Sequence, residues 1–593
     1  MQAGLFAPFF MIFRILSFLA IALPVLVGYS VAPIPTFFNE ILSFCFILLL
    51  TTLSLFRSRP ASSLPTPWVM SSFEFALKLA LLLVLLSLLF NSSFLEYDRG
   101  MASIVSFFVL SAVLILHGVG SYLDCRITSS LVKNISAAFA CLAVILSLHI
   151  FMQRLELGVD LGLVIQRYDT TIRPSGSIGQ PNHAATFLSI GLALSTLYFS
   201  ACSRTRYRNT MILIVLLSCF VSLGLGLTGS RSGLISLLLW TILVTFLYQR
   251  KTIRWFSFGL FVVALIGHVT LQAQAPEIER YLPTKSIWDY RLGVWANSVQ
   301  MISTHPLFGV GLGNFNFSWV LTSFSEKPVE FFTDPHNVVL RIAVECGIPT
   351  ALLFATGLFG IPGYYVTRLL RSRRVELRFS KVAPLAILAP IMAHAMVEYP
   401  LSYAYFLLPA AIATGLMVAN SKASSISEEV AYRSKGFTRS LFAGVLACLA
   451  ILSSMSVSRY LTSAERFDES LRTATEKKTD VQVFPFDLFY RLIVESPTES
   501  IDERRARVES SARLRFRPSL LCELIAVEYS DGSLNRAGYL WRRLGELRMG
   551  EDHVARCKRQ LTTELGESAL SRIANADDDA SITWRDFISR RSE

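Results

Sequence analysis

The chain has 593 residues, of which 53% are hydrophobic and only 17% are charged, and its mean hydropathy is +0.50. A soluble core does not need so much apolar material, so the composition excludes a soluble globular protein and predicts a polytopic membrane protein. The net charge of +12 could suggest nucleic-acid binding, but much of the basic charge lies in short clusters between apolar stretches. Membrane topology explains that distribution better, and we expect no nucleic-acid partner.

The apolar stretches set the fold class. About thirteen of them, each of roughly 17 to 25 residues, are long enough to cross a ~30 Å hydrocarbon layer as a helix. The first begins near Phe9 and the last ends near Val457. Because apolar stretches recur over so much of the chain, we expect the first to be a membrane span and not a cleavable signal peptide.

The chain changes character after the last apolar stretch. From about Tyr460 to Glu593, Arg and Glu are abundant and apolar residues recur at helical spacing. We therefore expect an all-α fold in two parts. The first is a transmembrane helical bundle of about 13 spans at 1–458, with an external loop at 273–336, and the second is a soluble helical domain at 459–593.

Basic residues predict the orientation of the chain. They cluster in alternate loops, which the positive-inside rule places in the cytoplasm together with the N-terminus. The clusters are Arg57 and Arg59; Arg126 and Lys133; Arg204, Arg206 and Arg208; Arg250, Lys251 and Arg254; Arg368, Arg371, Arg373, Arg374, Arg378 and Lys381; and Lys422, Arg433, Lys435 and Arg439. The C-terminal domain is then external, where Cys522 and Cys557 could form a disulfide, although the sequence leaves open whether they do.

Five polar motifs fall on the predicted external face and could form one site. They are RPSGSIGQPNHAA at 173–185, TGSRSG at 228–233, DYRLGVW at 289–295, DPHN at 334–337 and HAMVEYPLSYAYF at 394–406. The sequence does not give the distances between them, so their convergence is a hypothesis.

Arg231 lies in a short connection between two apolar runs, close to the membrane boundary. An arginine there extends its side chain to water, pairs with an acid or binds an anion, and the first is the commonest. Its neighbours Gly229 and Gly233, and its position on the side opposite to the basic loops, favour an anion. A guanidinium group suits phosphate oxygens, so we predict that Arg231 binds a lipid diphosphate and that Arg291 supplies a second contact.

His336 stands at the start of an apolar stretch, where an interfacial side chain is the commonest interpretation. Its neighbours favour chemistry, because Asp334 and Asn337 could orient the ring and Pro335 fixes the chain on entry to the helix. A neutral imidazole can accept a proton from an attacking hydroxyl near pH 7, so we predict that His336 is a general base. No cysteine or histidine lies near it at zinc-binding spacing, and we expect neither a metal nor a cofactor.

Two acidic residues, Glu345 and Glu398, are set among apolar ones. A buried carboxylate is costly unless it is paired, so we expect each to hold an arginine in place. Tyr399 and Tyr403 could be interfacial aromatic residues or acceptor contacts, and the sequence leaves both open.

Three segments together resemble the O-antigen ligase and polymerase superfamily of bacterial inner-membrane glycosyltransferases. They are TGSRSGLISL, YRLGVWANSVQMISTHPLFGVGLGNF and HNVVLRIAVECGIP, in that order. Within the superfamily, RPSGSIGQPNHAATFLSIGLAL and HAMVEYPLSYAYFLLPAAIATG are similar to the protein O-oligosaccharyltransferases that glycosylate pilins and other exported proteins. The superfamily often carries a histidine near the end of the first span, where this chain has Ser30, so a role for that histidine is in doubt here.

The resemblance implies en bloc transfer of an oligosaccharide from an undecaprenyl-diphosphate carrier to Ser or Thr hydroxyls of an exported, pilin-like protein. The reaction would take place on the periplasmic face of the bacterial inner membrane, and no cofactor or metal is implied. Carried over by motif, the base is His336; the donor-binding residues are Arg231, Arg291, Gln180, Asn182 and Arg173; and the supporting residues are Asn337, Glu398, Tyr399, Tyr403 and Glu345.

Other functions remain open at this point. An O-antigen ligase acting on lipid A core, or an O-antigen polymerase, would use the same arginines and histidine and would differ in its acceptor. A lipid-linked sugar flippase should have polar groups in both leaflets, whereas the polar motifs here gather on one predicted face. A scaffold without catalytic activity would leave the arginines unexplained.

Overall fold

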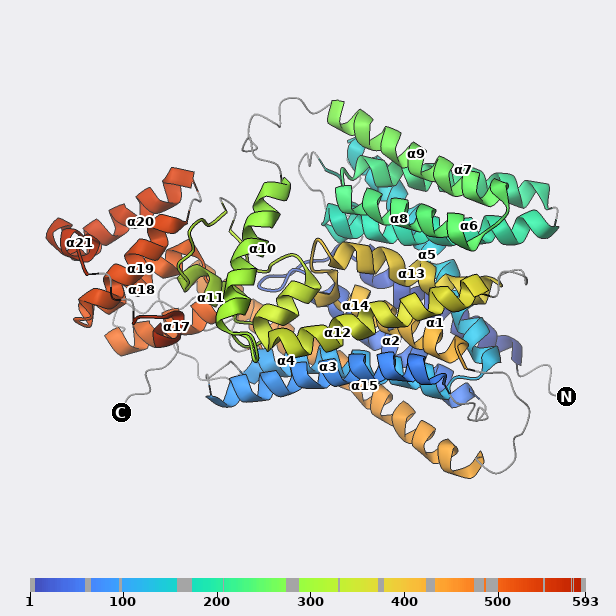
Figure 1. Cartoon of the computed structure of the whole chain (residues 1–593), viewed down its shortest axis with the longest axis horizontal. Coiled ribbons are helices and arrows are strands. Elements are labelled where there is room, and N and C mark those ends of the chain that lie inside the picture. Colours follow the sequence, from blue (N-terminus) through green and yellow to red (C-terminus); the bar gives the residue numbers. More distant parts are fainter. Residues whose placement is uncertain are drawn as a thin grey trace. The chain divides into compact units, whose positions relative to one another are not determined.

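The computed structural model describes residues 6–58, 66–94, 99–156, 173–205, 207–273, 287–328, 331–371, 378–422, 432–473, 485–486, 500–547, 550–577, 579 and 581–587. Regular secondary structure in these ranges is helical, which confirms the predicted all-α fold. The helices, labelled in Figure 1, are α1 (Phe6–Leu26), α2 (Phe37–Arg57), α3 (Trp68–Phe94), α4 (Arg99–Tyr122), α5 (Cys125–Arg154), η1 (Gly176–Ile178), α6 (Pro181–Thr205), α7 (Arg208–Leu227), α8 (Arg231–Leu247), α9 (Lys251–Ala273), α10 (Ile287–Thr304), α11 (Phe315–Leu321), α12 (Val338–Arg371), α13 (Phe379–Ala395), η2 (Pro400–Ser402), α14 (Ala404–Asn420), α15 (Tyr432–Thr473), α17 (Ile501–Arg515), α18 (Pro518–Ser530), α19 (Leu534–Glu546), α20 (Gly550–Leu565), α21 (Glu567–Ala574) and η3 (Trp584–Phe587).

The apolar helices agree with a multi-pass membrane protein. Nine helices of the described part are long and apolar enough to cross a membrane. Four further apolar helices are shorter, at Met11–Leu26, Arg231–Leu247, Phe379–Ala395 and Ala404–Asn420. The count of about thirteen spans and the orientation of the termini stay predictions.

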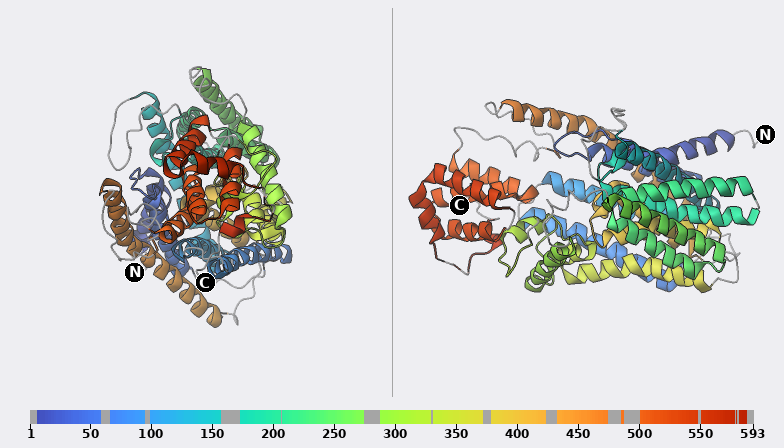
Figure 2. Two further views of the ribbon diagram at one scale, coloured as in Figure 1. Left: turned by 90° about the vertical axis from the view of Figure 1, so that its left-hand side faces the viewer. Right: turned by 90° about the horizontal axis from the view of Figure 1, so that it is seen from above.

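Contacts divide the chain into two compact units, and the first consists of Met1–Lys78, Phe108–Leu282 and Ala355–Val457. Helix α6 is central to it, because α6 contacts α5, α7, α8 and α13 and has the largest buried share, 78%, of any candidate span. Helices α6 to α9 lie side by side in Figures 1 and 2. At Gly226 of α7, an added Cβ would lie 2.3 Å from the Ala264 carbonyl oxygen of α9, so only glycine fits there. This close packing fixes the end of α7, which the TGSRSG motif follows directly.

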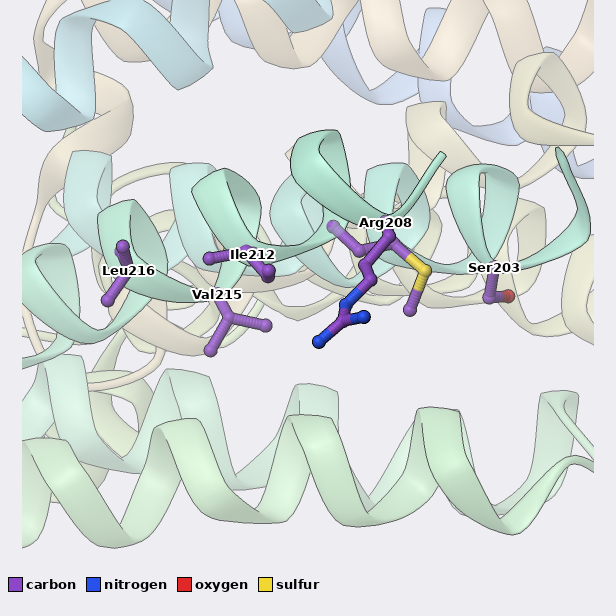
Figure 3. A pocket seen from close by; sticks show the side chains of 6 residues that line it. Ser203, Arg208, Ile212, Val215 and Leu216 are labelled. Atoms are coloured by element: carbon purple, nitrogen blue, oxygen red, sulfur yellow. The ribbon is translucent and has the colours of Figure 1, made fainter. Parts of the chain in front are cut away.

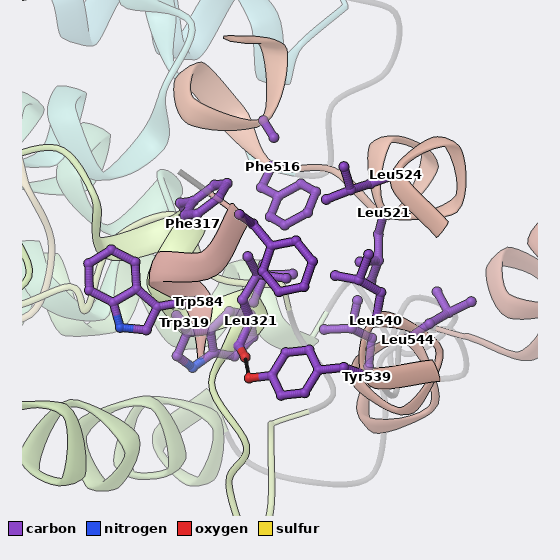
Figure 4. Packing of buried hydrophobic residues seen from close by; sticks show 14 of the residues in the cluster. Phe317, Trp319, Leu321, Phe516, Leu521, Leu524, Tyr539, Leu540, Leu544 and Trp584 are labelled. Carbon is purple, nitrogen blue, oxygen red and sulfur yellow. Dashed lines mark hydrogen bonds between the residues drawn. The ribbon is translucent and has the colours of Figure 1, made fainter. Parts of the chain in front are cut away.

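The second unit consists of Leu79–Phe107, Pro283–Phe354 and Ser458–Glu593. Its core joins α11 to helices α17 to α21, which belong to the C-terminal domain (Figure 4). Every residue of α11 is buried, and Phe317 of α11 stacks on Phe516 with ring centroids 5.3 Å apart. The apolar face of the C-terminal domain is therefore covered in part by a segment that lies about two hundred residues earlier in the chain.

The two units differ from the predicted division at 458 and 459. One boundary lies between 457 and 458, but the second unit also takes in 79–107 and 283–354, which were predicted to belong to the membrane domain. The buried side chains of α11 explain why 283–354 is included, because they pack with the C-terminal helices. Residues 274–286 and 329–330 of the predicted external loop lie outside the described residues.

A disulfide joins two helices of the C-terminal domain. Cys522 of α18 is bonded to Cys557 of α20, with Cα atoms 5.7 Å apart. The sequence analysis left this pairing open. Disulfides persist in oxidising compartments, so the bond agrees with the predicted external location of this domain.

Candidate active site

Three of the five polar motifs meet in the first unit, around the side chain of Asn182. Asn182 is the second residue of α6, and its Oδ1 accepts hydrogen bonds from Arg173 Nη2 at 3.2 Å and from Ser230 Oγ at 2.8 Å. Its Nδ2 donates to Glu398 Oε1 at 3.3 Å. One amide therefore links all three motifs, which the sequence could suggest but not show.

Arg231 begins helix α8 beside this network. Ser230 caps the helix, because its Oγ accepts a hydrogen bond from Gly233 N at 3.2 Å. Gly229 has φ of +65°, a left-handed conformation that favours glycine, and an added Cβ there would lie 3.2 Å from Arg173 Nε. Glycine therefore permits both the turn before Arg231 and the close approach of Arg173.

The positive groups around the network have the chemistry of an anion site. Arg173 and Arg231 have exposed side chains, and His268 of α9 lies within electrostatic range of both guanidinium groups. Helices α6 and α8 both begin here, and a helix N-terminus carries the equivalent of about half a positive charge. Two guanidinium groups and two helix N-termini suit a phosphate or diphosphate group.

Gln180 and Tyr403 contact the first turn of α6 at His183. Gln180 Oε1 accepts a hydrogen bond from His183 N at 2.6 Å, so this side chain caps α6, and its contact with a diphosphate stays a prediction. Tyr403 meets the His183 ring edge-on with centroids 4.6 Å apart and stacks on Tyr399 at 6.1 Å. Glu398 bonds to Asn182, which in turn bonds to Arg173, and the expectation that Glu398 itself holds an arginine in place stays a prediction.

In the second unit, a short turn presents His336. His336 has φ of +56°, which residues other than glycine rarely adopt. Its backbone N–H donates to Asp334 Oδ1 at 2.7 Å, and its Nδ1 lies 2.8 Å from the Asp334 carbonyl oxygen. A carbonyl oxygen can only accept, so Nδ1 carries a proton, and in the neutral ring the lone pair is then on Nε2. This tautomer is the one that a base acting through Nε2 requires.

The neighbours of His336 fix the turn from both sides. Trp295 Nε1 of α10 donates to the Pro335 carbonyl oxygen at 2.8 Å. Arg291 precedes Trp295 by one helical turn, so the two side chains project from the same face of α10. Asn337 Oδ1 accepts from the backbone N–H groups of residues 339 and 340 at 3.0 and 3.1 Å, which caps α12. A direct effect of Asn337 on the His336 ring stays a prediction.

Arg341 is a further candidate for the site, and its role was not predicted from the sequence. Its Nη1 lies 3.1 Å from Asp334 Oδ2 and its Nε lies 3.3 Å from Glu345 Oε2, so it joins the carboxylate that holds His336 to a second, buried one. Glu345 therefore holds an arginine, as expected. The spacing of Arg341 and Glu345, four residues apart in an apolar helix, was the signal available in the sequence.

The structure thus brings the predicted residues together in two sets. The first unit holds Arg173, Gln180, Asn182, Arg231, Glu398, Tyr399 and Tyr403, and the second unit holds Arg291, His336, Asn337 and Glu345. Among the residues that the structure describes, no group of three or more His, Cys, Asp or Glu side chains is arranged to hold a metal ion.

A pocket of about 470 Å³ lies at the other end of α7 (Figure 3). It is lined by Ser203, Arg208, Met211, Ile212, Val215 and Leu216. None of the predicted site residues lines it, and most of its lining is apolar, so it is not the candidate active site.

Three family models match parts of the chain. The model of the O-antigen ligase matches residues 212–355, that of the C-terminal part of the virulence factor membrane-bound polymerase matches 382–492, and that of the protein glycosylation ligase matches 174–197. These matches include every predicted site residue except Arg173. The helical membrane fold and the matches confirm the predicted resemblance to the O-antigen ligase superfamily.

Two relatives from Acinetobacter baylyi specify the branch. The chain is 28% identical over 292 residues to a general O-oligosaccharyltransferase and 24% identical over 305 residues to a ComP-specific O-oligosaccharyltransferase. The matches span 47% and 50% of this chain and about half of each relative, 49% and 53%. Within the superfamily, the chain resembles the protein O-oligosaccharyltransferase branch, as its motifs predicted.

Proposed function

We propose that the chain transfers an oligosaccharide en bloc from an undecaprenyl-diphosphate carrier to Ser or Thr hydroxyls of exported, pilin-like proteins. The reaction takes place on the periplasmic face of a bacterial inner membrane. The observation that carries the proposal is the His336 turn, where the Nδ1–H donates to the Asp334 carbonyl and the lone pair is on Nε2. The two named relatives support a protein acceptor.

The proposal assigns acceptance of the proton to His336 and stabilisation of the diphosphate to three arginines. The acceptor hydroxyl oxygen attacks the anomeric carbon of the glycan, its proton passes to His336 Nε2, and the bond from that carbon to the diphosphate breaks. Arg173 and Arg231, with Arg291, stabilise the negative charge of the leaving diphosphate. Attack from the side opposite to the leaving group inverts the anomeric centre, so NMR of donor and product should show opposite configurations.

A second candidate is an O-antigen ligase that uses lipid A core as acceptor, which the match of the O-antigen ligase model to 212–355 favours. Both candidates share the donor and the base, so the acceptor must decide between them. We would express the chain in cells that supply a lipid-linked glycan and a candidate pilin. The intact mass of the pilin and the gel profile of lipopolysaccharide would then be compared with cells lacking the chain. Added glycan mass on the pilin supports the proposal, whereas decoration of lipid A core with an unchanged pilin favours the ligase.

A further inference from the structure

We propose that the C-terminal domain positions the base, and that Asn316 is the residue through which it does so. The base lies in residues 331–337, which we call the His336 loop. This inference rests on the proposed function for its catalytic meaning. The structural coupling on which it depends can be tested without any activity.

Asn316 lies on α11 and bonds to both partners at once. Its Oδ1 accepts from the backbone N–H of Phe516 at 2.7 Å, at the point where α17 ends. Its Nδ2 donates to the carbonyl oxygen of Phe332, in the His336 loop, at 3.0 Å. Asn316 is only 8% exposed, so both bonds are shielded from water, and the loss of either would leave a buried polar group unpaired.

Phe332, whose carbonyl oxygen accepts the Asn316 hydrogen bond, also packs on the base. Its ring meets the His336 imidazole edge-on, with centroids 5.3 Å apart and an interplanar angle of 90°. Phe332 is 2% exposed, and its ring also meets Trp319 of α11 edge-on at 6.2 Å. A displacement of the Phe332 backbone would therefore move a ring that packs directly on His336.

Among the described residues, the other hydrogen bonds and ion pairs from the C-terminal domain to this part of the chain that are detailed below reach α11 or the residues just after it. The Tyr539 hydroxyl donates to the Leu321 carbonyl oxygen. Lys327 Nζ donates to the Val320 carbonyl oxygen at 2.8 Å and lies 3.2 Å from Glu546 Oε2. These contacts hold α11 in place, whereas the Asn316 side chain continues to the His336 loop.

The His336 loop needs such support because of its backbone. His336 adopts a left-handed φ of +56°, and a conformation of this kind persists only when surrounding contacts impose it. Asp334 and Trp295 supply contacts from nearby segments. Asn316 adds one that depends on the C-terminal domain.

The test compares Asn316→Ala with Ser323→Ala in the full-length chain. Ser323 is a matched control, because its Oγ also bonds to the C-terminal domain, at Glu546 Oε1 and 3.3 Å, but does not reach the His336 loop. The first readout is hydrogen–deuterium exchange of the backbone amides of 331–337, which needs no substrate. The second is the split between kcat and KM, with a synthetic undecaprenyl-diphosphate disaccharide as donor and a pilin-like protein as acceptor.

Asn316→Ala should speed exchange in the His336 loop about tenfold, because local opening becomes easier. It should also lower kcat about tenfold with the donor KM within about twofold, because a misplaced base slows the chemical step more than binding. Ser323→Ala should change neither. Equal exchange and equal rates in the two variants would overturn the inference.

A second variant covers the case in which Asn316→Ala loosens the whole C-terminal domain. Asn316→Asp keeps an acceptor for the Phe516 N–H and replaces the donor to Phe332 with a carboxylate oxygen, which repels the Phe332 carbonyl oxygen, so it should speed exchange in 331–337 while α17 and α18 stay protected. Unchanged exchange in 331–337 would overturn the inference. If the coupling appears by exchange but the unaltered chain transfers no glycan, the proposed function fails and the structural link stands.

Discussion

Asp334 offers a strong test of how the base is held. One carboxylate oxygen accepts the His336 N–H at 2.7 Å and the other lies 3.1 Å from Arg341 Nη1, with the side chain 9% exposed. A hydrogen bond to a charged group contributes about 1.5–3 kcal/mol, and each 1.4 kcal/mol is a factor of ten. Asp334→Ala should therefore lower the population of the productive turn, and with it kcat, about 10- to 150-fold.

The assay measures initial rates of glycan transfer by the full-length chain in nanodiscs, at several donor concentrations. The donor KM should stay nearly constant, because the Arg173 and Arg231 network lies on other elements. Asp334→Asn serves as the control, since its amide oxygen can still accept the His336 N–H while the ion pair with Arg341 is lost. A smaller loss is expected for Asn than for Ala. An Asp334→Ala variant within about threefold of the unaltered rate would refute the argument that Asp334 holds the turn.

Three further outcomes follow from other parts of the structure. Arg173→Ala should raise the donor KM about tenfold with a smaller change in kcat, measured in the same assay, because it removes a charge-assisted phosphate contact. Cys522→Ser should destabilise the C-terminal domain by about 4 kcal/mol, given the sequence separation of 35 residues, and exchange in α18 and α20 should rise accordingly. Burial lowers the pKa of Lys327 from 10.5 to about 8. Between pH 8 and 10.5 the unfolded chain therefore holds the Lys327 proton more tightly than the folded chain does. The free energy of unfolding of the second unit in urea should rise over that range, and Lys327→Met should abolish the rise.

Much of the membrane architecture could be predicted because it depends on local sequence. A helix in lipid must satisfy its backbone bonds internally, so the length of an apolar stretch is enough to predict the helix. The motifs around Arg173, Asn182 and Arg231 were also visible, because arginine is unusual in such stretches. The amide of Asn182 that joins them was not visible, since hydrogen bonds across 48 and 216 residues have no local signature.

The His336 loop shows where prediction from the sequence ends. His336 and Asp334 could be paired by proximity in the chain, but nothing in DPHN indicates the left-handed φ of His336 or the hydrogen bond from its Nδ1 that sets the tautomer. Asn316 and Phe332 gave no signal, because an asparagine and a phenylalanine in an apolar segment are ordinary. Helical periodicity in the C-terminal domain predicted helices but not the surface that they cover, so the packing on α11 was missed.

The central claim is that His336 accepts the proton of the attacking hydroxyl. The most direct measurement is the single-turnover rate of glycan transfer by His336→Ala and by the unaltered chain, with donor saturating and exchange used to show that the loop remains folded. We expect a rate at least about 100-fold lower for His336→Ala, because general base catalysis typically contributes 10²–10⁴-fold. An undiminished rate in the variant would contradict the mechanism and leave His336 as an interfacial side chain.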